Sequence, residues 1–564
     1  MSNLTYTTDA DGPAVSAPPP AAASPVGWWL GPGPTQAADP SALADALSDI
    51  RHPLYLLEPE GAAPAIGRGG VVQLGGEDRP TAEAIALLAQ APPIHPGQLG
   101  DAGFRADHRV RLAYMTGAMA NGIASAELVE AVSRGGMLGC FGAAGLSVGE
   151  IERAIDRLQS NLGDQPFCFN LIHSPNEPRH EWAVADLYIR KGIRLVEASA
   201  YLDLTPAVVR YRLHGIRQQA DGRVVTPNRI IAKASRIEVA RRWFSPPPPA
   251  MVEQLLRDGQ IDRHQAQLAA RVPMAEDLTA EADSGGHTDN RPAVTLLPTL
   301  LALRDRLATE HAYDRPLRVG AAGGIGTPEA AAAAFAMGAA YIVSGSVNQA
   351  CRESGSSDLV RRMLAETEQA DVIMAPAADM FEMGVKLQVL KRGTMFAMRA
   401  AKLYEVYRAC DGIDQIPATD RAALEKTIFR ASLEQVWQRT SAFFSEREPD
   451  QVARAETDPK HKMALVFRWY LGLSSRWAND GEPDRQIDYQ VWCGPAMGAF
   501  NEWTRGSFLA DPAQRDVVTV AWNILFGAAV CTRAQILRSQ GAALGAVPLR
   551  LEPRTRGQLA EVMR

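Results

Sequence analysis

The stretch RVGAAGGIGTPEAAAAAFAMGAAYIVSGS, residues 318–346, decides the fold. It holds two short apolar runs, each followed by a glycine turn, with an alanine-rich segment of helical composition between them. Glycine lets backbone N–H groups approach a bulky or charged group, and it adopts dihedral angles that other residues avoid. The stretch therefore predicts a strand–helix–strand unit whose two loops have room for a phosphate.

The same rhythm of apolar run, Gly/Ser/Asn loop and helix begins near residue 106 and repeats along the chain. Strands that alternate with helices pair in parallel. Eight such runs predict an α/β protein with a closed (β/α)8 TIM barrel over residues 106–350. The runs are LAYMTGAMA (112–120), MLGCFGA (137–143), FCFNLI (167–172), IRLVEAS (193–199), RIIAKAS (229–235), DLTAEAD (277–283), LRVGAAGG (317–324) and AYIVSGS (340–346).

An open doubly wound sheet is the alternative to the barrel. It is less favoured because no G-x-G-x-x-G motif with a following acidic residue opens the first unit. The sixth unit is irregular, since residues 241–276 contain a proline break and a segment of helical composition.

Composition divides the rest of the chain. Residues 13–25, PAVSAPPPAAASP, are typical of a mobile arm, whereas SALADALSDI (41–50) and PLYLL (53–57) predict a helix and a strand. After residue 350, segments with helical spacing predict a helical appendage. We predict a disordered Pro/Ala-rich arm (1–40), a small N-terminal subdomain (41–105), the barrel (106–350), a mainly helical subdomain (351–545) and a tail (546–564).

The charge and cysteine content exclude several classes of function. The 564 residues carry a formal net charge of −6, which argues against a nucleic-acid partner. The six cysteines lack the spacing of a zinc site or a disulfide framework, so we predict no metal and a reducing compartment. The acidic start has no apolar signal core, and no uninterrupted apolar stretch is long enough for a bilayer. We predict a cytoplasmic protein with no membrane partner.

The two glycine turns are the first candidate site. If the two apolar runs of the opening stretch are strands seven and eight, their loops lie where TIM barrels commonly hold a phosphate. Gly323, Gly324, Gly345 and Ser346 would then offer backbone N–H groups, and Thr327-Pro328 would cap a helix whose N-terminus favours an anion. Each turn alone is explained by chain reversal, but both in adjacent units favour a phosphate.

Further motifs carry a resemblance to a known family. The sequence resembles the FMN-dependent barrel family of nitronate monooxygenases and flavin-type enoyl-acyl-carrier-protein reductases, over roughly residues 50–545. It is most similar to the trans-acting enoyl reductases of bacterial polyketide and polyunsaturated fatty acid synthases. The motifs are GAMANGIASAELVEAVSRGGMLGCFGAAGL (117–146), FCFNLIHSPNEP (167–178), VEASAYL (196–202), IIAKASRIEVA (230–240), ADSGGHTDNRP (282–292), AAGGIGTPEAA (321–331), APAADMFEMGVKLQVLKRGT (375–394) and DYQVWCGPAMGAFNEW (488–503).

The resemblance implies an FMN site built from several of these motifs. The two glycine turns would hold the FMN phosphate, and Asn170 would hydrogen-bond the flavin ring unless it is only a turn residue. Lys233 interrupts an apolar strand, which is costly unless it faces an anion such as the reduced flavin. The loop residues expected along the edge of the flavin ring are Ala118, Met119, Ala120 and Asn121.

The motif ADSGGH supplies the candidate catalytic residue, His287. In the family this histidine lies over the flavin, and Gly285 and Gly286 let the loop approach a ligand; a surface-loop histidine is the alternative. The monooxygenase motif has Glu-Ala before Gly-Gly-His, whereas this chain has Asp283-Ser284, which argues against monooxygenase activity. The weaker polar candidates at strand ends are His173 and Glu197.

The resemblance implies reduction of a trans-2-enoyl thioester on an acyl carrier protein, with NADPH reducing FMN and FMN reducing the β-carbon. It leaves a homodimer open. A flavin oxidase of the nitronate monooxygenase type and a non-catalytic synthase-recruiting scaffold are the alternatives. Segment 380–402, rich in Met, Lys and Arg, is expected to roof the barrel mouth and to help dock the carrier.

Overall fold

The computed structural model describes residues 25–33, 36–75, 78–173, 175–542, 544 and 551–563. The chain forms two compact units. The smaller is Met1–Pro93 with Arg533–Leu549, and the larger is Ile94–Thr532 with Arg550–Arg564. Most of the predicted arm (1–24, 34 and 35 of 1–40) and part of the predicted tail (546–550 and 564 of 546–564) lie outside the described residues.

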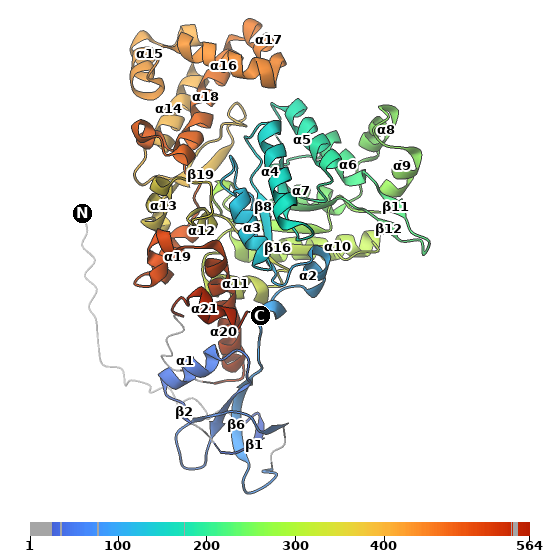
Figure 1. The fold of residues 1–564 in the computed structure, drawn as a ribbon, viewed down its shortest axis with the longest axis vertical. Helices are drawn as coiled ribbons and strands as arrows, with labels where there is room; N and C mark the ends of the chain where they lie inside the picture. The colour runs from blue at the N-terminus through green and yellow to red at the C-terminus, as the bar shows by residue number, and fades with distance from the viewer. Residues whose placement is uncertain are drawn as a thin grey trace, which may run out of the picture. The chain divides into compact units, whose positions relative to one another are not determined.

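The larger unit contains a closed barrel of eight parallel strands, which confirms the predicted α/β class and TIM barrel (Figure 1). Each of the apolar runs predicted from the sequence contains one strand, and a helix returns the chain between most of them, as parallel pairing requires. The strands are β7 (Tyr114–Thr116), β8 (Leu138–Phe141), β9 (Cys168–Ile172), β10 (Leu195–Ser199), β13 (Arg229–Ala234), β14 (Asp277–Glu281), β16 (Arg318–Ala322) and β17 (Ile342–Ser344).

The helices of the barrel begin at clear sequence signals. Ser147 and Glu150 form a capping box, and the Thr327 hydroxyl accepts from the Ala330 N–H at 3.3 Å with Pro328 following it, as predicted. The irregular sixth unit contains the expected helical insert. The helices are α3 (Ala126–Arg134), α4 (Val148–Leu162), α5 (Pro178–Lys191), α6 (Pro206–Leu213), α7 (Ile237–Phe244), α8 (Pro249–Arg257), α9 (Arg263–Ala269), α10 (Ala293–His311), α11 (Pro328–Ala336) and α12 (Ser346–Gln349), and a hairpin of β11 (Arg217–Gln218) and β12 (Val224–Val225) follows α6.

Side chains close the end of the barrel where the strands begin. Phe104 of α2 (Ala102–His108) stacks on Tyr341 with ring centroids 4.2 Å apart. Beside it, Asp277 accepts hydrogen bonds from His108 Nε2 at 2.8 Å and from Arg318 Nε at 2.6 Å. Any ligand site in the barrel is therefore confined to the opposite end, where the strands finish.

A mainly helical region follows the barrel, as predicted, and it begins with a small sheet. In this sheet β19 (Lys386–Leu390) pairs antiparallel with β18 (Val372–Pro376) and with β15 (Gly286–His287), a short strand after β14. The helices are α13 (Asp358–Ala365), α14 (Phe396–Ala409), α15 (Ala418–Leu424), α16 (Leu433–Arg447), α17 (Pro449–Thr457), α18 (Pro459–Asp480), α19 (Ala496–Thr504), α20 (Val517–Ser539) and α21 (Arg556–Ala560).

The smaller unit is built on a six-stranded antiparallel sheet in the order β2-β4-β3-β6-β1-β5. Two of its strands fall within residues 1–40, the range expected to be an arm. Trp29 of β1 is buried against Leu57 and Leu87, which explains why this part of the range is ordered. The elements are α1 (Pro40–Ser48), β1 (Gly27–Leu30), β2 (Gln36–Ala37), β3 (Leu54–Glu58), β4 (Ala65–Gly67), β5 (Val71–Leu74) and β6 (Ile85–Ala91).

One expectation about apolar stretches needs correction. Helix α20 is long and apolar enough to cross a membrane by length and composition alone. However, 89% of its most apolar window is buried inside the protein. This burial is that of a core helix.

The buried carboxylate at the closed end of the barrel generates a prediction about stability. Burial alone would raise the pKa of Asp277, but hydrogen bonds and charge from His108 and Arg318 lower it well below its usual value. Because the pKa is lower in the folded state, the ionised carboxylate stabilises the fold above about pH 4, and this contribution is lost as the pH falls further. Asp277→Asn should cost about 3 kcal/mol at pH 7.

The measurement is urea unfolding followed by fluorescence at pH 7 and pH 3. The difference between wild type and variant should be large at pH 7 and should shrink at pH 3. Asp305→Asn, which removes an exposed partner of Arg304, is the control and should change little. Equal midpoints for wild type and Asp277→Asn at pH 7 would contradict the assignment.

Candidate functional site

Two adjoining cavities open at the end of the barrel where the strands finish. The larger has a volume of about 340 Å³ and the smaller about 80 Å³. They adjoin because residues after β7, on β13 and β14, and from the helical region line both. The shared residues are Ala118, Met119, Lys233, Glu281, Gly285 and Trp492.

The smaller cavity lies between the two glycine turns predicted from the sequence. Gly323 and Gly324 follow β16, Gly345 and Ser346 follow β17, and all four line this cavity. The Ser344 hydroxyl ties the two turns together by donating to the Ile325 carbonyl at 3.0 Å. The structure therefore brings the predicted phosphate residues together at one small cavity.

The backbone of these turns has room and unused donors. Among the described residues, the N–H groups of Gly324, Gly345 and Ser346 donate to no protein acceptor. A Cβ on Gly324 or Gly345 would meet nothing within 4 Å, so the space beside each is open. Ser284 also lines this cavity, and its buried hydroxyl has no hydrogen-bond partner in the described part of the chain. This donor set suits an anion.

Two other glycines are needed for close packing of the backbone. Gly323 has a φ of +85°, and a Cβ there would lie 2.6 Å from the Ala282 carbonyl carbon. A Cβ on Gly285 would lie 2.9 Å from the Cys493 backbone. Gly286, with a φ of +84°, lines the larger cavity and has open space beside it.

Lys233 lies between two carboxylates where the cavities meet. Its Nζ is 2.6 Å from Glu281 Oε1, so the protein itself supplies the anion that the buried lysine requires. Burial would lower the pKa of Lys233, but Glu281 and Glu197 raise it above its usual value. Burial raises the pKa of Glu197, which is fully inaccessible to solvent. Sequence reasoning found Lys233 and Glu197 but missed Glu281, which stands in the quoted run DLTAEAD.

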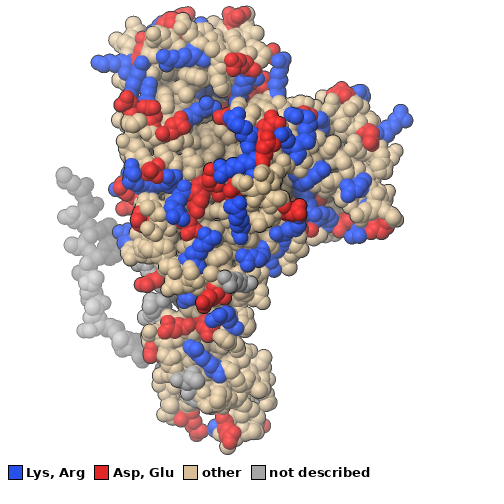
Figure 2. Space-filling model, in the orientation of Figure 1, with Lys and Arg blue, Asp and Glu red and all other residues tan. Residues whose placement is uncertain are grey.

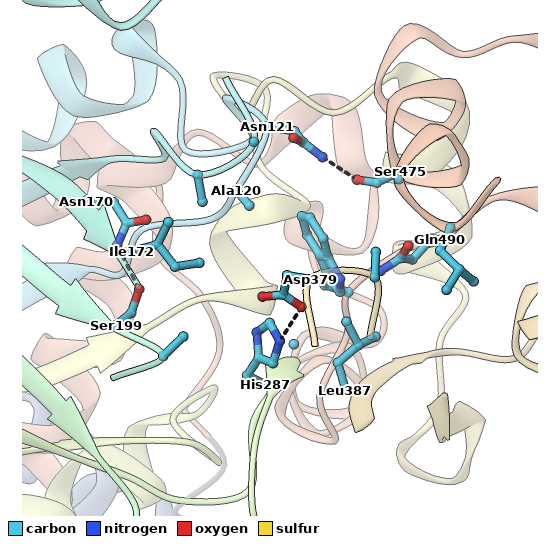
Figure 3. Close-up of a pocket in the computed structure, with 18 of the residues that line it drawn as sticks. Ala120, Asn121, Asn170, Ile172, Ser199, His287, Asp379, Leu387, Ser475 and Gln490 are labelled. Carbon is cyan, nitrogen blue, oxygen red and sulfur yellow. Dashed lines mark hydrogen bonds and ion pairs between the residues drawn. The ribbon is translucent and has the colours of Figure 1, made fainter. Parts of the chain in front are cut away.

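The loop after β7 lines the larger cavity, as predicted, through Ala118, Met119, Ala120 and Asn121. Not all of its polar groups face the cavity. The Ala118 N–H donates to Glu197 Oε2 at 2.9 Å. The Asn121 side chain donates to the Ser475 hydroxyl of α18 at 2.9 Å, so it links the barrel to the helical region (Figure 3).

Asn170 lies at the cavity wall in register with Glu197 on the neighbouring strand. Its amide nitrogen donates to the Glu197 carbonyl at 3.1 Å and to the Ser199 hydroxyl at 2.9 Å (Figure 3). Both hydrogens of the Asn170 side-chain amide are thus used within the protein, and its side-chain oxygen is the group that remains for a ligand.

His287 lines the larger cavity and lies on strand β15, where the sequence predicted a loop. Its Nε2 donates to Asp379 Oδ1 at 3.0 Å (Figure 3). Burial would lower the pKa of His287, but the charge and hydrogen bond of Asp379 raise it. Asp379 was missed as a partner because it lies far along the chain, although it stands in the quoted motif APAADMFEMG.

His173, the other strand-end histidine, does not line either cavity. Its Nδ1 bonds to Glu181 Oε2 at 2.9 Å, and its ring stacks on Tyr201. The Glu181 carboxylate also accepts from the Tyr201 hydroxyl at 3.0 Å. His173 therefore belongs to a packed polar cluster beside the site.

The helical region supplies the outer wall of the larger cavity. Ala378, Asp379 and Leu387 line it, and of these only Leu387 belongs to the segment 380–402 that was expected to roof the barrel mouth. The methionines of this segment do not line it: Met380 is buried, and Met383, Met395 and Met398 are exposed outside both cavities. Aromatic and aliphatic residues of α16 and α18 line the cavity instead, namely Phe443, Phe444, Trp469, Leu471 and Leu473.

The chain matches two models of known protein families. Residues 112–435, more than half of the chain, match the family model described as nitronate monooxygenase. The chain belongs to the nitronate monooxygenase family. Residues 410–489, which include α15 to α18, also match the model of the inserted helical domain of [acyl-carrier-protein] S-malonyltransferase.

Within the nitronate monooxygenase family, the chain is similar to proteins of lipid and polyketide synthesis. It is 47% identical over 514 residues to one of the polyunsaturated fatty acid synthase subunits from Thraustochytrium sp., covering 90% of this chain and 34% of that protein. It is 44% identical over 433 residues to polyketide biosynthesis protein PksE of Bacillus subtilis, covering 77% and 56%. The chain thus spans about a third and about half of these relatives.

One solved structure is similar to this chain over most of its length. The enoyl reductase domain of MlnA, from the macrolactin biosynthesis cluster of Bacillus amyloliquefaciens, superimposes with a TM-score of 0.72 at 37% identity, covering 78% of this chain and 98% of that domain. These matches confirm the resemblance to enoyl reductases of polyketide and polyunsaturated fatty acid synthases.

The pair of His287 and Asp379 in this family member gives a prediction about pH. Because Asp379 raises the pKa of His287, Asp379→Asn should lower the midpoint at which His287 takes up its proton. The measurement is an NMR titration of protein labelled at histidine, assigned with His287→Gln. Glu181→Gln, which removes the carboxylate beside His173, is the matched control and should leave the His287 midpoint unchanged. An unchanged midpoint in Asp379→Asn would refute the coupling.

Proposed function

We propose that the protein is a trans-acting enoyl reductase. It reduces the α,β-double bond of enoyl thioesters carried by an acyl carrier protein, in polyketide or polyunsaturated fatty acid synthesis, with FMN as cofactor and NADPH as reductant. The observation that carries the proposal is the match to the MlnA enoyl reductase domain over 98% of that domain. Because the chain spans only part of the length of its relatives, we assign their activity to it as a proposal.

The residues of the smaller cavity fit the phosphate of FMN. The unused N–H groups of Gly324, Gly345 and Ser346 are donors, the spaces beside Gly324 and Gly345 are open, and the unpartnered Ser284 hydroxyl is a further donor. Ser284 replaces the Ala of the monooxygenase motif. The flavin ring would then lie toward the larger cavity, beside Lys233 and the loop after β7. FMN would supply two-electron transfer between the reduced nicotinamide and the conjugated double bond.

The protein side chains of the larger cavity have two tasks. Lys233 keeps a positive charge at the junction of the cavities, where it stabilises negative charge that develops on a ligand. Reduction of the double bond consumes two electrons and two protons, and NADPH brings the electrons with one proton equivalent. His287, whose pKa is raised by the hydrogen-bonded Asp379, would donate the second proton to the α-carbon.

The carrier protein and the cellular location extend the same proposal. The match of α15 to α18 to a helical domain of an acyl-carrier-protein transferase supports a carrier-bound substrate. Figure 2 shows Lys and Arg interspersed with Asp and Glu over this region. A docking site for the carrier protein would therefore use a small local group of charges and not one large basic surface. We also propose that the protein is cytoplasmic. Its buried cysteines are free thiols, which suits a reducing compartment. They are Cys140, Cys168, Cys351, Cys410 and Cys493.

Gly345→Asp tests the cofactor site at a glycine that does not have a left-handed conformation. The φ of Gly345 is −122°, and a Cβ there meets open space, so the carboxylate would enter the smaller cavity and repel a phosphate. Gly345→Asn, of nearly the same size but neutral, is the matched control. We expect the Asp variant to bind FMN at least about tenfold more weakly than the Asn variant, which corresponds to about 1.4 kcal/mol. The measurement is calorimetric titration of FMN into apoprotein. Equal affinities of the two variants would show that the FMN phosphate does not bind in this cavity.

His287→Ala tests the catalytic assignment. A general acid typically contributes about 10²–10⁴-fold, so turnover of a crotonyl thioester should fall by that order while FMN stays bound. His173→Ala, at the strand-end histidine outside the cavities, is the control and should retain turnover. Wild-type turnover in His287→Ala would leave His287 without a catalytic role. Oxygen consumption with an alkyl nitronate, without any reduction of the thioester, would favour the oxidase alternative.

A further inference from the structure

Gly472 occupies an unusual position on helix α18. It lies in the middle of this helix, is exposed, and lines the larger cavity. Glycine is among the least favourable residues in a helix interior because it gives up the most backbone freedom. Its presence at a cavity wall therefore calls for a reason.

Close packing does not supply that reason. A Cβ on Gly472 would meet nothing within 4 Å. Two other helical glycines differ in this respect: a Cβ on Gly498 of α19 would lie 2.1 Å from the Gln369 nitrogen, and one on Gly527 of α20 would lie 2.6 Å from Pro328. No protein neighbour among the described residues requires Gly472 to lack a side chain, although it is one of the residues that line the cavity.

Helix α18 is attached to its surroundings on both sides of Gly472. Arg468 Nε donates to the Ala378 carbonyl at 2.8 Å, and Ser475 accepts from Asn121 at 2.9 Å. Residues 468, 472 and 475 are spaced so that they share one face of the helix, and seven residues of helix span about 10 Å. Gly472 thus faces the gap between two fixed attachment points.

The gap leads to the candidate catalytic histidine. Ala378 precedes Asp379, which bonds to His287, and Asn121 ends the cavity-lining stretch after β7. In Figure 3 the pair of Asn121 and Ser475 lies across the open pocket from the pair of His287 and Asp379. Phe443 and Trp469 line the same cavity, so its outer part is suited to a slender, partly apolar chain.

We propose that Gly472 is a specificity-determining residue that keeps open the passage for the acyl-pantetheine arm of the thioester. This inference rests on the proposed function. A side chain at position 472 would fill the gap between the two attachment points, where a linear arm has to lie for its thioester to reach His287. The phosphate end of the cofactor would be unaffected in the smaller cavity, since Gly472 does not line it.

The test uses the FMN-loaded enzyme and the variants Gly472→Ala and Gly472→Leu. The probe is hexanoyl-pantetheine, a saturated thioester that binds without reacting, titrated by calorimetry. We expect Gly472→Leu to weaken its affinity by an order of magnitude or more, as overpacking of a filled site does. Gly472→Ala should have a small effect on affinity and should raise the melting temperature, because alanine favours a helix.

Gly149→Leu is the matched control. This glycine is also exposed in a helix, α4, but lines neither cavity, and a Cβ there approaches only the Arg153 side chain at 3.8 Å. It should leave the affinity for hexanoyl-pantetheine unchanged. FMN content and the rate of reduction by NADPH should be unchanged in all three variants, which separates a blocked passage from a damaged fold.

Three outcomes would overturn the inference. If the wild type reduces enoyl thioesters and Gly472→Leu binds hexanoyl-pantetheine as tightly as the wild type, the inference fails alone. If Gly472→Leu slows reduction by NADPH but keeps thioester affinity, the passage serves the nicotinamide and the inference is wrong. If the wild type neither binds nor reduces any enoyl thioester, the proposed function fails together with it.

Discussion

The pairing of β17 with β7 is the constraint on which the site depends. It closes the barrel by joining the last strand to the first, with Ser344 opposite Thr116. The Gly117 N–H then donates to the Ser344 carbonyl at 3.0 Å. This closure sets the glycine turn at Gly345 next to the loop that lines the larger cavity, so two parts of the candidate site that are remote in sequence become one.

Charge balance at the mouth of the barrel comes from the pairing of β13 with β10 and with β14. Lys233, Glu197 and Glu281 come from three neighbouring strands, and removing Lys233 would leave two carboxylates at the mouth of the barrel without a compensating charge. The arrangement also explains why the lysine is tolerated in an apolar strand. Lys233 has Glu281 as a partner within the protein, so its burial does not by itself require a bound flavin.

Much of the barrel was predictable because its signals are local. Each strand is an apolar run before a small-residue loop, and Thr327-Pro328 begins its helix as the capping rules require. The glycine turns were predictable for the same reason. The two glycine turns follow β16 and β17, and because these strands are neighbours in the barrel, the turns imply a shared cavity once the strand order is known.

The partners of the site residues were not predictable, since they come from distant segments. Asp379 reaches His287 only because β19 pairs with β15, and Asn121 binds a helix that follows the barrel. Antiparallel pairing with a remote strand leaves no periodic signal near His287. The methionines of segment 380–402 have helical spacing but pack or face solvent elsewhere, because spacing alone does not say which face meets the cavity.

The absorption spectrum of the purified protein tests the central claim most directly. We expect a yellow protein whose flavin band is bleached by NADPH without oxygen and restored by stoichiometric addition of a crotonyl thioester, with butyryl thioester as the product. A protein that carries no flavin, or whose bleached band returns with oxygen and a nitronate but not with the enoyl thioester, would contradict it.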